Sequence, residues 1–138
     1  MSTPEDDDWL HRFTPAEWMR KAMGEFAQAR EAYASRDARG GLAGCRRAAG
    51  VALNAWLAGL DALPAEYGRT YMEHLAALTT DASAPEPVRE AAVLLRTTPL
   101  AGGEIVPLRT AGAEARVLDA TETILAHTYA AVLRATPP

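Results

Sequence analysis

Arg69 and His74, in the stretch RTYMEH, have the types and the spacing that could do chemistry on a phosphate. Histidine can move a proton at a ribose 2′-hydroxyl or at a leaving oxygen, and arginine can offset the charge of the phosphate. Five residues of regular helix turn one side chain about 140° from the other, so the pair converges only if a helix begins after Gly68. The alternative, which we favour, is that Arg69 is a surface charge and His74 a capping or core-edge residue.

A second candidate site is a group of arginines around the turn that we expect between the first two long helices. Its members are Arg30, Arg36, Arg39, Arg46 and Arg47. Guanidinium groups pair well with phosphates and carboxylates, so this group could bind a phosphate or an acidic partner. Glu31 and Asp37 lie beside it, however, and the chain carries a net charge of −4. We therefore favour a solvated face, and we expect no nucleic-acid binding unless the chain is a ribonuclease.

The acidic residues and the cysteine do not form a metal-binding pattern. The run from Glu5 to Asp8 has no calcium-loop context, and neither Glu-x-x-His nor His-Glu-x-x-His occurs in the sequence. Glu73 and His74 are adjacent, so on a helix their side chains point about 100° apart and would not share one ion. Cys45 is a single cysteine on an apolar helix face, where we expect a small buried residue. The sequence predicts no metal and no cofactor.

The composition indicates helices. Of the 138 residues, 30 are alanine, the best helix former, while β-branched and aromatic residues are few. No stretch alternates with a period of two, which argues against a sheet. A chain of this length is expected to form one domain with one core. We predict an all-α fold, a single up-and-down bundle of four to five helices over residues 14–136, preceded by a flexible acidic arm over residues 1–13.

The first long helix is expected to begin after Thr14. Thr14 and Glu17 form a capping box, with a proline at the first helical position, and apolar side chains recur at helical spacing from Trp18 onward. In the preceding arm, Trp9 and Phe13 are the residues that could attach its end to the bundle.

The second long helix, capped by Asp37 or Ser35, has an unusually slim middle. Its small residues include Gly44, Ala48, Gly50 and Ala52. They would let a neighbouring backbone approach closely, either inside the bundle, which we favour, or at a seam between two copies of the chain. A hairpin of the first two helices would bring Trp18 and Trp56 to the same end of the bundle, as core or interface anchors.

Three further helices complete the predicted bundle. They span about residues 64–78, 86–96 and 113–134. Ser83 and Glu86 have the spacing of a capping box for the middle one. Between the last two helices, residues 97–112 contain two prolines and three glycines, so we expect a long loop there.

The order and spacing of these elements resemble those of the HEPN superfamily over about residues 16–134. The resemblance lies in the pattern Trp18-x-x-x-Ala22-x-x-x-Phe26, the alanine-rich second helix that ends Ala-Trp-Leu, the His74-Leu75 pair and the long final helix. It implies a helical domain of a class that includes metal-independent ribonuclease toxins, partners of small nucleotidyltransferases and inactive scaffolding modules.

The ribonucleases of that superfamily usually carry an arginine, four to six residues and a histidine near the start of the final helix, and two such motifs meet across a dimer. In the corresponding helix of this chain, Arg116 and His127 are eleven residues apart. That separation is roughly 16 Å of helical rise, too far for both side chains to bind one phosphate. The matching pair Arg69 and His74 lies on the wrong helix for the family pattern.

We therefore predict a non-enzymatic helical interaction module, an accessory or partner of a nucleotidyltransferase or of a toxin–antitoxin type system. We expect it to bind a protein partner and to form a homodimer through an alanine-rich face. Two alternatives stay open: a metal-independent ribonuclease that uses Arg69 and His74, and a tetratricopeptide-like adaptor built on the first helical hairpin. Because no secretion signal or membrane-spanning run is visible, we expect a bacterial-type cytoplasmic protein with no membrane association.

Overall fold

The computed structural model describes residues 8–99 and 107–135, and every regular element within these ranges is helical. The elements in chain order are α1 (Asp8–His11), α2 (Pro15–Ala34), α3 (Ala38–Ala58), the 3₁₀ helix η2 (Ala65–Tyr67), α4 (Tyr71–Thr80), α5 (Glu86–Thr97) and α6 (Pro107–Ala135). The predicted all-α bundle is thereby confirmed. No helix of the described part is long and apolar enough to cross a bilayer.

The α2–α3 hairpin begins and turns at the residues that the sequence indicates. The Thr14 hydroxyl accepts from the Glu17 amide at 3.1 Å, and a Glu17 carboxylate oxygen accepts from the Thr14 amide at 2.9 Å. Asp37, not Ser35, caps α3, since its carboxylate accepts from the Gly40 amide at 2.8 Å. These bonds satisfy backbone donors that a helix start leaves without a partner.

α3 is the central helix of the bundle, in contact with α2, α4 and α6. Its small residues allow this close packing. A Cβ added to Gly44 would lie 2.9 Å from the Ala29 Cβ of α2, and one added to Gly50 would collide with the Tyr71 ring of α4. The slim middle of the second helix therefore serves packing inside one chain, as favoured above, and a seam between copies would have to use another face.

The third predicted helix is divided in two. Gly68 adopts a φ of 62°, which ends η2, and α4 begins only after Thr70. A positive φ suits glycine because a side chain would be strained there. Thr70 and Glu73 then form a capping box that restarts the helix, with the Thr70 hydroxyl accepting from the Glu73 amide at 3.1 Å.

Two other predicted boundaries differ from the structure. Ser83 does not cap α5: its hydroxyl donates to Asp81 at 2.6 Å, and the residue before α5 is Pro85, without a side-chain cap. The final helix begins at Pro107, six residues before the predicted start at residue 113. Proline is well tolerated in the first turn of a helix, where its missing N–H has no intrahelical partner to lose.

The part of the expected arm that the structure describes is folded onto the bundle as α1. Leu10 is 1% exposed, and its carbonyl accepts from the Trp18 indole N–H at 2.7 Å. Phe13 packs edge-on against Trp18 with ring centroids 4.9 Å apart. Residues 8–13 therefore belong to the bundle, and residues 1–7 lie outside the described residues.

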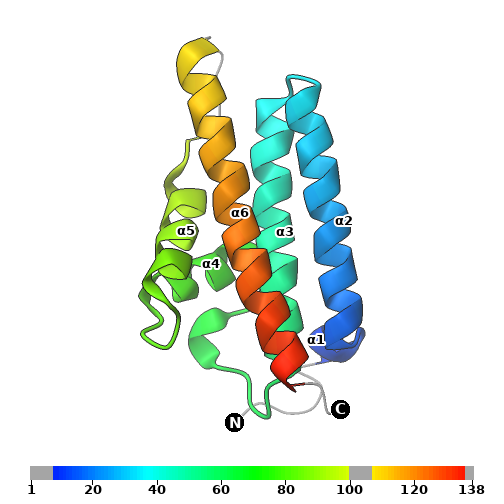
Figure 1. Cartoon of the computed structure of the whole chain (residues 1–138). Helices are drawn as coiled ribbons and strands as arrows, with labels where there is room; N and C mark the ends of the chain where they lie inside the picture. Colours follow the sequence, from blue (N-terminus) through cyan, green and yellow to red (C-terminus); the bar gives the residue numbers. More distant parts are fainter. Residues whose placement is uncertain (1–7, 100–106, 136–138) are drawn as a thin grey trace.

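Three long helices, α2, α3 and α6, lie side by side, with the shorter α4 and α5 packed on the side away from α2 (Figure 1). α2 and α3 are antiparallel, but α6 runs in the same direction as α3 (Figure 1). The C-terminal ends of both helices accordingly meet at one hollow, lined among others by Trp56, Val132 and Arg134. The α4–α5 hairpin brings the chain back before α6 begins, so α3 and α6 are parallel neighbours. In a strict up-and-down bundle, neighbouring helices would instead be antiparallel.

Candidate functional site

His74 lies in the centre of the bundle, on the first turn of α4. Its side chain is fully buried, with Nδ1 2.6 Å from the Tyr67 carbonyl oxygen and Nε2 2.7 Å from the Asn54 side-chain oxygen. Trp9 stacks beside the imidazole, with ring centroids 6.2 Å apart and planes at 24°. Both ring nitrogens thus have protein partners, and the ring has no face open to a substrate.

The hydrogen bonds of His74 define how it holds its proton. A carbonyl oxygen can only accept, so Nδ1 carries a proton and donates to Tyr67. In the charged ring Nε2 also donates, to the Asn54 oxygen; in the neutral ring it accepts from the Asn54 amide nitrogen after the amide rotates. Burial lowers the pKa of His74 and outweighs the opposing effects of the Tyr67 carbonyl and the Glu73 charge. The neutral ring is therefore the form that the bundle favours at neutral pH.

Arg69 is not brought to His74. It lies in the link between η2 and α4, is exposed, and its backbone amide donates to the Glu73 carboxylate at 3.3 Å. His74 points into the core from the helix that follows. The helix does begin after Gly68, as convergence of the pair requires, yet one side chain is at the surface and the other is fully buried. In this conformation the pair does not form one phosphate-binding site.

A second polar group near His74 ties η2 to the end of α4. The Tyr67 hydroxyl donates to one Asp81 oxygen at 2.6 Å, and Ser83 donates to the other from its amide and hydroxyl. Burial, followed by the hydrogen bond to Asp81, raises the pKa of Tyr67. Burial acts to raise the pKa of Asp81 as well, but the bonds from Ser83 and Tyr67 outweigh it and lower that pKa. This arrangement holds the α4–α5 hairpin in place.

The arginine group predicted around the first turn is divided among separate roles. Arg46 extends from α3 to the end of α5, where it donates to the Leu95 and Thr98 carbonyls at 2.8 Å each and to the Arg96 carbonyl at 3.4 Å. Arg47 pairs with Glu25 at 3.1 Å. Of the predicted binding residues, these two are thus used within the bundle.

The other two predicted binding residues, Arg36 and Arg39, are exposed at the α2–α3 turn, and Arg36 has a φ of 65°. On α6, Arg116 is exposed, while His127 is partly buried and has its pKa lowered by burial and then by Arg134. Cys45 is fully buried, and burial raises the pKa of its thiol. No group of three metal-ligating side chains occurs among residues 8–99 and 107–135.

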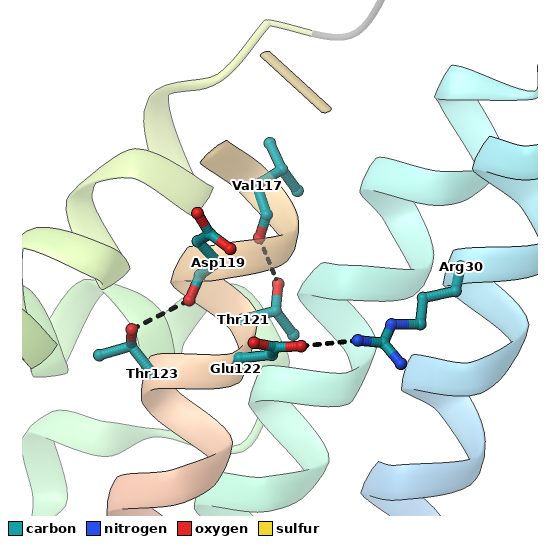
Figure 2. A network of polar contacts seen from close by, with 6 residues as sticks. All are labelled: Arg30, Val117, Asp119, Thr121, Glu122 and Thr123. Atoms are coloured by element: carbon teal, nitrogen blue, oxygen red, sulfur yellow. Dashed lines mark hydrogen bonds and ion pairs between the residues drawn. The ribbon is translucent and has the colours of Figure 1, made fainter. Parts of the chain in front are cut away.

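A largely apolar groove of about 520 Å³ lies on the surface between α2 and α6. Its lining residues are Met23, Phe26, Arg30, Glu122, Leu125, Ala126 and Tyr129. Arg30 of α2 reaches over to Glu122 of α6 at 2.7 Å (Figure 2), and both residues line the groove. Large apolar side chains stand out along the same face: Met23 is 54% exposed, Tyr129 51% and Leu133 56%.

This groove was not identified from the sequence. The signal that could have found it is the spacing of Ala126, Tyr129 and Leu133, which continues the helical period on the side of α6 away from Val117, Ile124 and Thr128. Comparisons of the chain with protein-family models, with curated proteins and with solved structures give no match.

Proposed function

We propose that this chain is a non-enzymatic helical interaction module whose binding face is the groove between α2 and α6. The observation that carries the proposal is the exposure of Met23, Tyr129 and Leu133 on one face around that groove. A contiguous apolar face on a small domain costs solvation free energy and is typical of a surface that another molecule covers. Methionine and tyrosine are also enriched at the centres of protein interfaces.

The burial of His74 supports a structural role in preference to catalysis. A general acid or base has to come within hydrogen-bond distance of the reacting group. For His74 to do so, both its bonds to Tyr67 and Asn54 would have to break and Trp9 would have to move away. The ribonuclease alternative thus requires opening of the core, whereas the interaction module uses the bundle as it stands.

The likeness of the helix order to HEPN domains supports an accessory role beside a nucleotidyltransferase or in a toxin–antitoxin type system. The tetratricopeptide-like alternative is less well supported, because it needs an open inner face on the α2–α3 hairpin. In this bundle α4 and α6 pack against α3 and cover that face.

Two experiments test the proposal. The first places a photo-reactive phenylalanine analogue at Tyr129, or at Val93 as a control, and exposes cells that express the full chain to light. Val93 is an exposed apolar residue of α5 and lies outside the groove lining. We expect polypeptide cross-links from position 129 and far fewer from position 93. An equal yield from both positions, or none from 129, would contradict the assigned face.

The second experiment incubates the purified chain with RNA in the presence of a chelator, beside a His74→Ala variant. We expect no cleavage above background from either protein. Cleavage by the wild type that disappears in the variant would instead establish the ribonuclease alternative.

A further inference from the structure

We propose that the molecule covering the α2/α6 groove is a second copy of this chain, in a two-fold dimer that sets α2 of each protomer against α6 of the other. This inference rests on the proposed function and names the partner for the same face. It is carried by the exposed stripes on the two helices, by their charges and by the size of the face.

Each of the two helices presents an exposed stripe with alternating spacing of three and four residues. On α2 the stripe is Arg20, Met23, Ala27 and Arg30; on α6 it is Asp119, Glu122, Ala126, Tyr129 and Leu133. Such spacing keeps side chains on one side of a helix and is the pattern by which two helices pack along their length. Within the chain these stripes face outward, since their residues are all exposed.

The charges on the two stripes have opposite signs. The charged members of the α2 stripe are Arg20 and Arg30, and those of the α6 stripe are Asp119 and Glu122. A two-fold axis parallel to the helices would set α2 of each copy against α6 of the other, so that Arg30 meets an acidic residue of the facing helix. Because α6 runs antiparallel to α2 (Figure 1), Arg20 would lie about 15 Å from that contact, towards the Tyr129 and Leu133 end of the face. An axis perpendicular to the helices would instead set α2 against α2 and α6 against α6, and facing stripes would then carry charges of one sign only and form no opposite-charge pair.

The ion pair within each chain fixes the register of this dimer. The Arg30 guanidinium and the Glu122 carboxylate are 2.7 Å apart, so these two charged groups lie at the same level along the bundle (Figure 2). Rotation about an axis parallel to the helices preserves height, so Arg30 would face the partner's Glu122, and the reverse contact would form by symmetry. The four side chains would make an alternating cluster, with Met23 and Tyr129 in the apolar part of the interface beside it.

The face has the size of a stable interface. α2 has 20 residues, about 30 Å of helix at 1.5 Å per residue. Two adjacent helices are about 20 Å wide, which gives a face of about 600 Å² in projection. The accessible surface of such a face is larger than its projection and approaches the roughly 800 Å² per partner of a standard interface.

The test uses sedimentation velocity of the full chain from about 1 to about 100 µM, the range in which a dimer with a micromolar Kd forms. Arg30→Glu places two carboxylates together at the interface, and Glu122→Arg places two guanidinium groups together, so each variant should weaken the dimer at least about tenfold. A mixture of the two variants restores opposite charges across the interface, although the pair inside each chain stays broken. We expect each variant alone to need at least about tenfold more protein than the wild type to dimerise, and the mixture to dimerise in the wild-type range.

Two controls make the same charge changes away from the face: Arg39→Glu on α3 and Glu90→Arg on α5, both at exposed positions. They should dimerise like the wild type, and circular dichroism should show equal helicity in every variant because an exposed ion pair adds little stability. A wild type that stays monomeric throughout, single variants that dimerise normally, or a mixture that stays monomeric would each overturn the inference. If the monomeric wild type still cross-links from Tyr129 to a different polypeptide, the proposed function stands and the dimer alone is refuted.

Discussion

Asn54 of α3 and His74 of α4 share a 2.7 Å hydrogen bond in a part of the core where both side chains are shielded from water. Through Nδ1, the same imidazole holds the carbonyl of Tyr67 in η2. Three elements are thus joined at one ring. A buried polar group is stable only while its partners are present, so this contact fixes the position of α4 against α3.

Replacing Asn54 with alanine should therefore destabilise the bundle. The change leaves Nε2 of His74 buried without a partner, which costs about 1–3 kcal/mol, and it also opens a small cavity. We expect a loss of about 2–4 kcal/mol in the free energy of unfolding, measured by urea titration with circular dichroism. Gln28→Ala removes an exposed amide from α2 and should change the stability by less than about 0.5 kcal/mol. If the loss of stability for Asn54→Ala were as small as that for Gln28→Ala, the buried contact between Asn54 and His74 would contribute nothing to stability.

The lowered pKa of His74 predicts a loss of stability in mild acid. The folded chain keeps the ring neutral at pH values where the unfolded chain, with a histidine pKa of about 6.5, has taken up a proton. Below that pH the unfolded state binds more protons, so the free energy of unfolding falls as the pH drops towards the folded pKa. The slope for one group is at most about 1.4 kcal/mol per pH unit.

This pH dependence is measured between about pH 7.5 and about pH 5.5, on either side of the unfolded histidine pKa. The background is His127→Gln, because burial lowers the pKa of His127 as well. Adding His74→Gln should make the stability nearly independent of pH in that interval. The lowered pKa values of Glu73 and Asp81 act only at lower pH, where their unfolded carboxylates begin to protonate. A dependence that survives in the double variant would assign the effect to other groups.

Local signals in the sequence were enough to locate the starts of α2 and α3. Thr14, Glu17 and Asp37 act on backbone groups three residues away, so their role is visible in the order of residues alone. The same kind of signal failed at Ser83, whose hydroxyl donates to Asp81 instead. A short polar side chain has several local partners, and the sequence does not show which one it takes.

The contacts that define the candidate site lie beyond such local reasoning. Asn54 and His74 are 20 residues apart, and Arg46 meets the end of α5 at Leu95, 49 residues away. These pairs form because α4 and α5 fold back against α3, and that arrangement depends on the turn at Gly68. The outward stripe on α6 could have been recognised from its helical period, but which helix lies beside it depends on the tertiary packing.

Arg46 should stabilise α5 through the carbonyls at its C-terminal end. Arg46→Met keeps most of the apolar stem and removes the donors to Leu95 and Thr98, and hydrogen bonds from a charged group are worth about 1.5–3 kcal/mol. We expect a loss of about 2 kcal/mol and faster amide exchange at Thr98. Arg47→Met, which removes an exposed pair with Glu25, should cost less than about 1 kcal/mol. Equal losses in the free energy of unfolding for the two variants would show that the contact of Arg46 with α5 stabilises the chain no more than an exposed ion pair does.

Two glycines on adjacent helices should respond in opposite directions to the same change. A Cβ at Gly24 of α2 would meet no atom within 4 Å, so Gly24→Ala gains helix propensity and should stabilise the chain by about 0.5–1 kcal/mol. A Cβ at Gly44 of α3 would lie 2.9 Å from the Ala29 Cβ, so Gly44→Ala must separate α2 from α3 and should cost about 1–3 kcal/mol. Thermal unfolding of both variants measures the contrast. If Gly44→Ala also stabilised the chain, the close approach of the two helices would not depend on this glycine.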